Sequence, residues 1–167
     1  MRTIRLPALL LGLLYLCFFC CLAAASSQLP ERVATHFDVH GQPNGWMSRD
    51  SHLLFMAVFG LVFPWFVPAV LYASRLLPDR FYNLPHRDYW LAPTRRAETL
   101  TYLFRHSLWF AAMALCFVIG IHFSILHANS LARVHVSAPV ALTLGGCLVG
   151  GTVVWGLSMI CHFKHVV

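Results

Sequence analysis

Four long apolar segments dominate the pattern of hydrophobic and polar positions along the chain. A helix needs about 20 apolar residues to cross the hydrocarbon core of a bilayer, and in lipid its backbone polar groups must be satisfied within the helix itself. All four segments have about this length, and only His122 interrupts the third. The pattern therefore predicts an all-α integral membrane protein, a four-helix transmembrane bundle. The predicted spans are residues 6–25, 53–72, 108–126 and 136–160.

The first apolar segment also has features of a secretory signal peptide. Arg2 and Arg5 precede it, and the small residues 23–26 resemble a cleavage site. However, its apolar run of 20 residues is longer than the roughly 7–15 residues typical of such peptides. We expect the segment to be retained as the first span. The alternative is cleavage, which would leave three spans.

Polar stretches at residues 26–52, 73–107 and 127–135 separate the four spans. From residue 95 the second stretch has apolar residues at helical spacing, which predicts an amphipathic interfacial helix that runs into the third span. We therefore expect three sections. They are residues 1–72 with the first two spans and the outer loop, residues 73–107 as a basic cytoplasmic segment, and residues 108–167 with the last two spans and a short tail.

The distribution of lysine and arginine predicts the orientation, because cytoplasmic loops carry an excess of both. Nine of the 12 lie on one side and three on the other. Three acidic residues lie on each side, so the side with nine holds the whole net charge of +6. We expect the richer side, with both termini, to be cytoplasmic and to face anionic headgroups of the bilayer. No nucleic-acid partner is then needed. The nine are Arg2, Arg5, Arg75, Arg80, Arg87, Arg95, Arg96, Arg105 and Lys164; the three are Arg32, Arg49 and Arg133.

The composition supports the same class of protein. Hydrophobic residues make up 59% of the chain and charged residues 11%, whereas soluble domains average roughly 45–50% and about 25%. The mean hydropathy is +0.68. These values exclude a disordered chain, a coiled coil and an ordinary soluble enzyme. They favour a multi-pass membrane protein.

The outer loop carries the most specific pattern in the chain. Residues 43–45 read Pro-Asn-Gly, which is a strong turn signal. Residues 33–39 partly alternate between apolar and polar, which permits a short extended segment. Trp46 follows, where an aromatic ring suits the membrane interface. The motif consists of Leu-Pro, a histidine with an aromatic neighbour, and Gly-x-Pro-x-Gly-Trp, at Leu29, Pro30, His36, Phe37, Gly41, Pro43, Gly45 and Trp46.

This motif closely resembles the bacterial membrane family named domain of unknown function 1648, which includes SdpI-like proteins. The resemblance implies one span before the loop and further spans after it. Residues 83–93 also look like a segment found in members of that family. SdpI-like proteins are longer and have more spans, and at least one is an immunity protein against a secreted toxic peptide. For most of the family the resemblance implies no known activity.

We therefore predict an accessory, sensory or immunity-like membrane protein that recognises an extracytoplasmic peptide, ligand or protein partner through the outer loop. His36 would make the contact, and the glycines with Pro43 would shape the turn. The cytoplasmic motif has two interpretations, membrane anchoring and partner docking. The predicted outer site is His36, Asp38, His40, Gly41, Pro43, Gly45 and Trp46, and the cytoplasmic motif is Asn83, His86, Asp88, Tyr89 and Trp90.

Ten histidines raise the question of a metal, since histidine is a common metal ligand. His36, Asp38 and His40 place three possible ligands within five residues. No closed spacing signature accompanies them, so an outer metal site remains an alternative with His36 and His40 as candidates, and we expect no cofactor. His122 is expected to be structural, reaching a headgroup or a loop carbonyl as a neutral ring. The tail around His162 and His165 is expected to be solvated.

No nucleophile–base set or nucleotide-binding fingerprint is present, and we expect no enzymatic activity. No Asp or Glu lies inside a predicted span, which argues against a proton-coupled transporter. Two features leave alternatives open. Pro64 and Pro68 predict a kink in the second span, which would suit a small transporter. Gly146 and Gly150 form a GxxxG spacing, for packing within the bundle or, alternatively, for a homodimer.

Overall fold

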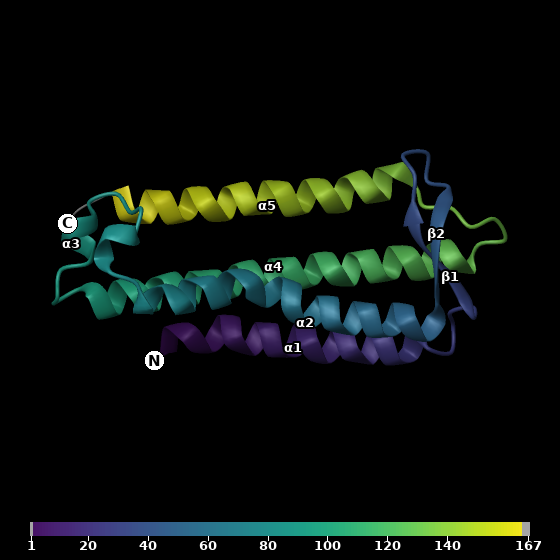
Figure 1. Ribbon diagram of the computed structural model, residues 1–167, viewed down its shortest axis with the longest axis horizontal. Helices are drawn as coiled ribbons and strands as arrows, with labels where there is room; N and C mark the ends of the chain where they lie inside the picture. The colour runs from purple at the N-terminus through teal and green to yellow at the C-terminus, as the bar shows by residue number, and fades with distance from the viewer. Residues whose placement is uncertain (1, 165–167) are drawn as a thin grey trace.

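The computed structural model describes residues 2–164, with side chains from residue 5 onward. Four long helices run along the molecule, a β-hairpin crosses one end and short helices lie at the other (Figure 1). We call these the hairpin end and the α3 end. The elements are α1 (Arg2–Ala25), β1 (Arg32–Phe37), β2 (Pro43–Ser48), α2 (Arg49–Ala73), the 3₁₀ helices η1 (Ser74–Leu76) and η2 (Asp79–Phe81), α3 (Arg87–Trp90), α4 (Arg96–Ser130) and α5 (Ala138–Lys164). His165 and the side chain of Arg2 lie outside the described residues.

Four helices, α1, α2, α4 and α5, are long and apolar enough to cross a membrane. This confirms the four predicted spans, and the protein has the character of a multi-pass membrane protein. The second span begins earlier than expected, because the Ser48 hydroxyl caps α2 by accepting a hydrogen bond from the Ser51 N–H at 3.2 Å. The division into three sections stays a prediction.

Helix α4 contains both the third span and the amphipathic segment that was predicted to run into it. It has 35 residues and contains no proline, so nothing interrupts its backbone hydrogen bonds. At 1.5 Å per residue it is about 52 Å long, whereas the hydrocarbon core is about 30 Å thick. Several turns of α4 therefore project beyond the apolar layer.

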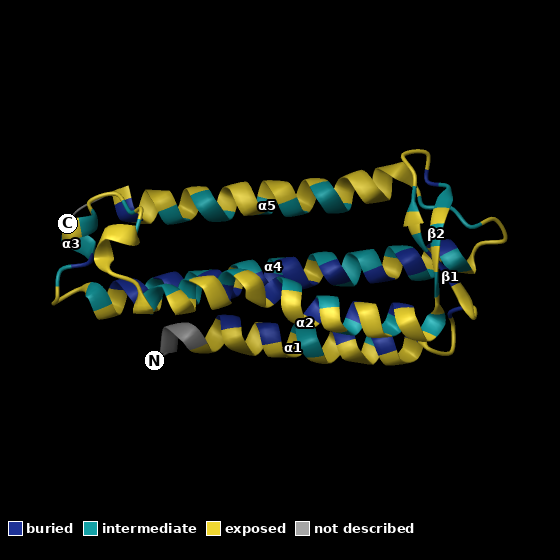
Figure 2. Ribbon diagram, viewed as in Figure 1, coloured by how far each residue is buried: buried dark blue, intermediate teal, exposed yellow. Residues whose placement is uncertain are grey.

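The core lies between α1, α2 and α4, whose facing sides hold most of the buried residues (Figure 2). Phe18 of α1 is fully buried against Gly60 of α2. A Cβ at Gly60 would come within 2.5 Å of the Phe18 ring, so a larger residue there would push the helices apart. The Tyr15 hydroxyl also donates to the Gly60 carbonyl at 3.0 Å. Close contact at one glycine thus sets the α1–α2 spacing.

Helix α5 is set apart from the other spans, and no residue of its most apolar stretch is buried (Figures 1 and 2). A Cβ at Gly146 or Gly150 would meet nothing within 4 Å. Packing of these glycines within the bundle is therefore not what the structure shows, and the homodimer alternative stays a prediction. Contacts with α4 instead form where Leu144 fills the space beside Gly120 and Met113 the space beside Gly151.

The outer loop departs from the all-α expectation, because β1 and β2 pair as an antiparallel hairpin. The turn also lies earlier than predicted, and the Pro-Asn-Gly sequence begins β2 instead. Pro43 is tolerated there as the first residue of an edge strand. Gly41 has a φ of 74° in the turn, and the Asp38 carboxylate accepts from the N–H groups of His40 and Gln42, each at 2.9 Å. This local carboxylate cap stabilises the turn.

Candidate functional site

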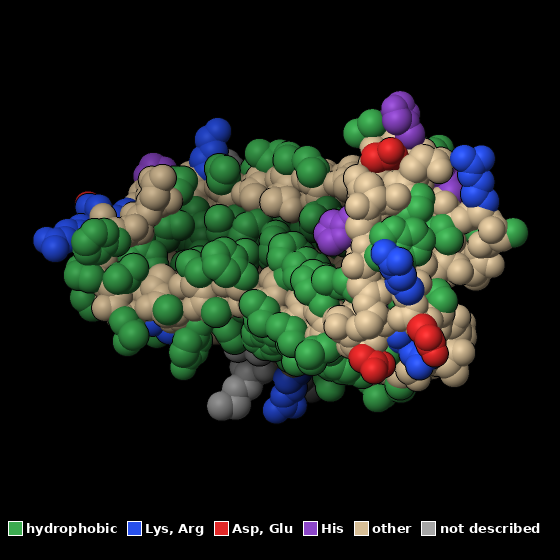
Figure 3. Space-filling model, turned by 45° about the vertical axis from the view of Figure 1, so that its right-hand side comes forward, with side chains coloured by type: hydrophobic (Ala, Val, Ile, Leu, Met, Phe, Trp, Pro, Cys, Tyr) green, Lys and Arg blue, Asp and Glu red, His purple; other side chains and the backbone are tan. Residues whose placement is uncertain are grey.

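An open apolar groove of about 340 Å³ lies at the hairpin end, between β1, α4 and α5. Figure 3 shows a hollow flanked by hydrophobic side chains. The strand β1 closes one end of this groove. The walls are Thr35, His36 and Phe37 of β1, Phe117, Ile121, Ser124 and Ile125 of α4, and Val136, Ala141, Leu144 and Gly145 from the loop before α5 and from α5 itself.

Together with its motif neighbour Phe37, His36 lines this groove. It pairs across the hairpin with Gly45, where a Cβ would come within 2.9 Å of the His36 Cβ and 3.1 Å of Nδ1. The absence of a side chain at residue 45 therefore leaves the space that the imidazole occupies. Nδ1 lies 3.2 Å from the Thr35 hydroxyl, and the ring remains exposed. His36 thus offers a polar contact, beside Thr35, on a mainly apolar lining.

Asn129, which the sequence analysis did not single out, holds the hairpin against α4. Its Oδ1 accepts from the Ala34 N–H at 2.9 Å, and its Nδ2 donates to the Ala34 carbonyl at 2.9 Å and to the Ile125 carbonyl at 2.8 Å. The side chain thus forms hydrogen bonds with both the N–H and the carbonyl of Ala34, as the backbone of a third strand would. The sequence feature that could have identified Asn129 is a polar amide side chain in the last turns of an apolar helix.

The other predicted residues of the outer site build the hairpin. Gly41 lies against the 131–137 loop, where its carbonyl accepts from the Val136 N–H at 3.0 Å. The Asp38 carboxylate is hydrogen-bonded within the turn, and His40 is exposed at its tip. Trp46 is not part of the groove and instead lies under Arg32, whose guanidinium carbon is 5.5 Å from the ring centroid. Within residues 2–164 no three His, Cys, Asp or Glu side chains gather closely enough to hold a metal ion.

Residues 13–61 match the model of the family described as Domain of unknown function (DUF1648). These residues are therefore similar to that family, and we call residues 13–61 the DUF1648 segment. The resemblance drawn from the loop motif is therefore confirmed for this segment, which runs from α1 through the hairpin into α2. No curated protein and no solved structure matches the chain.

The DUF1648 segment forms only one side of the groove. It contributes β1 with His36, and it contains the Phe18–Gly60 contact that spaces α1 and α2. The remaining walls come from α4, the following loop and α5. Asn129 also lies outside the segment. The family motif therefore shapes the hairpin, while the rest of the chain completes the cavity against which it lies.

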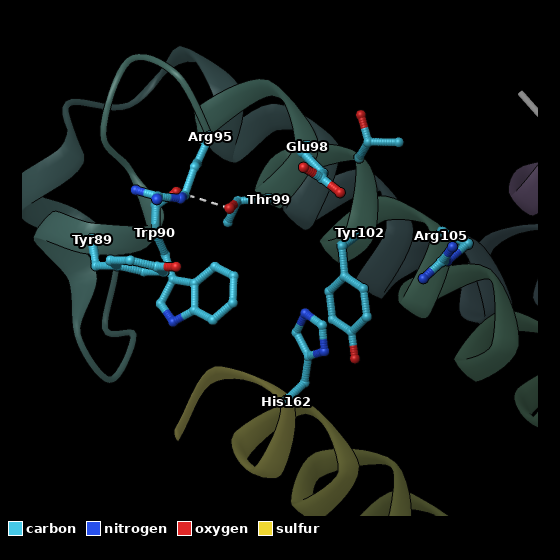
Figure 4. Close-up of a pocket in the computed structure, with 9 residues that line it drawn as sticks. Tyr89, Trp90, Arg95, Glu98, Thr99, Tyr102, Arg105 and His162 are labelled. Carbon is cyan, nitrogen blue, oxygen red and sulfur yellow. Dashed lines mark hydrogen bonds between the residues drawn. The ribbon is translucent and has the colours of Figure 1, made fainter. Parts of the chain in front are cut away.

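A second pocket, of about 510 Å³, lies at the α3 end, outside the DUF1648 segment (Figure 4). The Trp90 indole N–H donates to the Phe163 carbonyl at 3.0 Å, and the Thr99 hydroxyl donates to the Trp90 carbonyl at 2.8 Å. These bonds tie α3 to both α4 and α5. The lining residues are Tyr89, Trp90, Arg95, Glu98, Thr99, Thr101, Tyr102, Arg105 and His162.

Aromatic rings and two arginines give this pocket its chemistry. The His162 ring stacks on Tyr102 with centroids 3.7 Å apart. The guanidinium carbons of Arg95 and Arg105 lie 4.0 Å from the Tyr89 centroid and 5.3 Å from the Tyr102 centroid. Cations stacked on aromatic faces in this way are suited to anionic groups at an interface.

Only part of the predicted cytoplasmic motif contributes to the pocket. Tyr89 and Trp90 line it, whereas Asn83, His86 and Asp88 do not. His86 precedes α3 with a positive φ of 51°, and Asp88 forms a surface pair with Arg87 at 3.2 Å. Tyr89 and Trp90 are thus the motif residues that the structure brings into this pocket.

The substitution Trp90→Phe should loosen α5 at the α3 end. The aromatic packing survives, but the bond to the Phe163 carbonyl is lost, which should lower the free energy of unfolding by about 0.5–1.5 kcal/mol. Hydrogen exchange should accelerate near Phe163. The control is Trp109→Phe, an exposed position on α4. Equal effects of the two substitutions would contradict the role of the Trp90 bond.

Proposed function

We propose that this protein is an accessory, sensory or immunity-like membrane receptor, rather than an enzyme, and that it binds an extracytoplasmic amphiphile in the hairpin-end groove. The observation that carries the proposal is the position of His36, a residue of the DUF1648 motif, on the wall of an open apolar groove. The ligand would place its apolar part between α4 and α5 and its polar part near His36.

The size and lining of the groove support a binding role. Ligand pockets are typically about 300–1,000 Å³ and mainly apolar, with a few polar groups that orient the ligand. The groove holds about 340 Å³, and its polar side chains are Thr35, His36 and Ser124. A membrane-active peptide or a single acyl chain fits this description. Neither Pro64 nor Pro68 lines either pocket described above, so they lend no support to the transporter alternative.

We also propose that the hairpin end faces outward from a bacterial inner membrane, with the α3 end in the cytoplasm. The excess of arginine among the elements of the α3 end supports this orientation. Arg95 and Arg105 in the α3-end pocket would then meet anionic headgroups, each worth about 1 kcal/mol near such a surface. The orientation can be tested by labelling single cysteines at residues 39 and 83 from either side.

Binding can be tested with dansyl-labelled undecanoic acid and with a dansyl-labelled amphipathic helical peptide, added to the protein in nanodiscs. Saturable energy transfer from tryptophan is expected with one of the two, which also identifies the ligand class. The substitution Gly145→Phe should abolish it, because this residue lines the groove and has open space around it. Its neighbour Gly146, which is open but outside the groove, provides the control Gly146→Phe. No saturable transfer with either probe would refute the proposal.

The substitution His36→Ala should weaken binding of the same probe about tenfold, the loss expected for one hydrogen bond to a polar head. The melting temperature should stay unchanged, because His36 is exposed. His40→Ala, at the exposed tip of the turn, is the matched control and should bind normally. If both variants bind equally to the unmodified protein, His36 makes no contact with the ligand.

A further inference from the structure

Two histidines are buried as a pair between α2 and α4. His52 and His122 are each only 1% exposed, and their ring centroids lie 6.3 Å apart with the planes 13° from parallel. None of the four ring nitrogens has a hydrogen-bond partner among the described residues. We expected His122 to reach a headgroup or a loop carbonyl, whereas the ring is buried and lies beside the main chain of Cys21 on α1. The pair is therefore an unexplained polar site inside the helix core.

The two rings are too far apart to satisfy each other. Heavy atoms in an N–H hydrogen bond lie about 2.7–3.2 Å apart, and ring centroids at 6.3 Å exceed that reach even when a nitrogen of each ring faces the other. A buried polar group without a partner costs about 1–3 kcal/mol. A small bridging group between the rings would remove this cost. The main chain of Cys21 on α1 passes beside His122 and supplies a further polar neighbour.

We propose that His52 and His122 form an internal two-histidine site for one monovalent d¹⁰ metal ion of the Cu(I) class. Bonds from histidine nitrogen to zinc, which is also a d¹⁰ ion, are about 2.0 Å long. With bonds of that length and one nitrogen of each ring turned toward the other, an ion in line between the rings gives a centroid separation close to the observed 6.3 Å. Imidazole suits copper among the first-row metals. Cu(I) accepts two ligands in a line, so two histidines suffice.

Other metals fit this pair less well. Zinc normally takes four ligands, and calcium and magnesium take oxygen ligands, whereas no third ligating side chain joins the pair within residues 2–164. The cost of transferring an ion out of water rises with the square of its charge, which favours a monovalent ion in an apolar interior.

The test uses the full chain with its six cysteines replaced by alanine, so that thiols do not bind the probe. Five of the six side chains are exposed, and this replacement leaves the core intact. The protein in detergent should bind one Cu(I) per chain, and X-ray absorption should show two nitrogen ligands. The variant His52→Leu/His122→Leu should bind none, and the exposed control His36→Ala/His40→Ala should bind normally. Absence of binding, or binding retained by the leucine variant, would overturn the proposal.

Thermal unfolding shows whether each variant is folded, and it distinguishes a bound ion from a bridging water. Cu(I) should raise the melting temperature of the cysteine-free protein by several degrees and leave that of the leucine variant unchanged. Without metal the leucine variant should melt at or above the temperature of its parent, because unsatisfied nitrogens have been replaced by apolar groups. A leucine variant that melts well below its parent without metal would show a pair already satisfied by water, and would refute the metal site.

Discussion

Replacing Gly41 by valine is expected to lower the free energy of unfolding by about 2–5 kcal/mol. A β-branched residue at the φ of 74° costs roughly 1–2 kcal/mol. Its Cβ would also collide with the Val136 carbonyl and the His135 ring, and overpacking of this kind costs about 1–3 kcal/mol. The Val136 N–H is bonded to the Gly41 carbonyl, so the loop cannot withdraw without losing that bond. Unfolding of the purified protein in detergent measures the effect.

The matched control for Gly41→Val is Gly146→Val on α5. A side chain at residue 146 meets nothing within 4 Å, and glycine is a poorer helix former than valine by a few tenths of a kcal/mol. This variant should therefore be as stable as the unmodified protein. Equal destabilisation by both substitutions would place the close contact of Gly41 in doubt. A loss at residue 146 alone would instead indicate a second copy of the chain on the open face of α5.

Replacing Asn129 by leucine is expected to lower the free energy of unfolding by about 2–4 kcal/mol. Three hydrogen bonds disappear, two of them to the backbone of Ala34, whose N–H and carbonyl are left unpaired at a fully buried residue. Each unsatisfied buried group costs about 1–3 kcal/mol. The hairpin should separate from α4, which increases proteolysis within residues 26–48 and accelerates hydrogen exchange at the Ala34 N–H.

The neighbouring residue provides the control for Asn129→Leu. The Ser130 hydroxyl bonds only to the His127 carbonyl of its own helix, at 2.8 Å, and lies at the surface. Ser130→Ala should therefore change stability by less than about 0.5 kcal/mol. Unchanged exchange at Ala34 in the Asn129 variant would show that the hairpin is held by its apolar contacts alone. Because β1 forms one wall of the groove, the Asn129 variant should also lose binding of the amphiphile, whereas Trp90→Phe should retain it.

Several features of the protein follow from the sequence by itself, because each depends on a local property. The four spans follow from the length of the apolar runs. The continuity of α4 follows from a segment without proline, which leaves its hydrogen-bond ladder intact. The motif around His36 was sufficient to identify the DUF1648 segment. A family motif and an apolar run can be recognised without knowing which residues they contact in the folded protein.

The tertiary structure decided the features that depend on contacts between distant residues. Strand pairing placed Pro43 in β2 and moved the turn to Gly41, because docking onto α4 decides which residues of the loop extend. The bond between Asn129 and Ala34 joins residues 95 apart in the chain. The open groove and the pair of His52 and His122 likewise exist only where α2, α4 and α5 are placed side by side. Local pattern cannot show such sites, because a side chain's partners are determined by packing in three dimensions rather than by its neighbours in sequence.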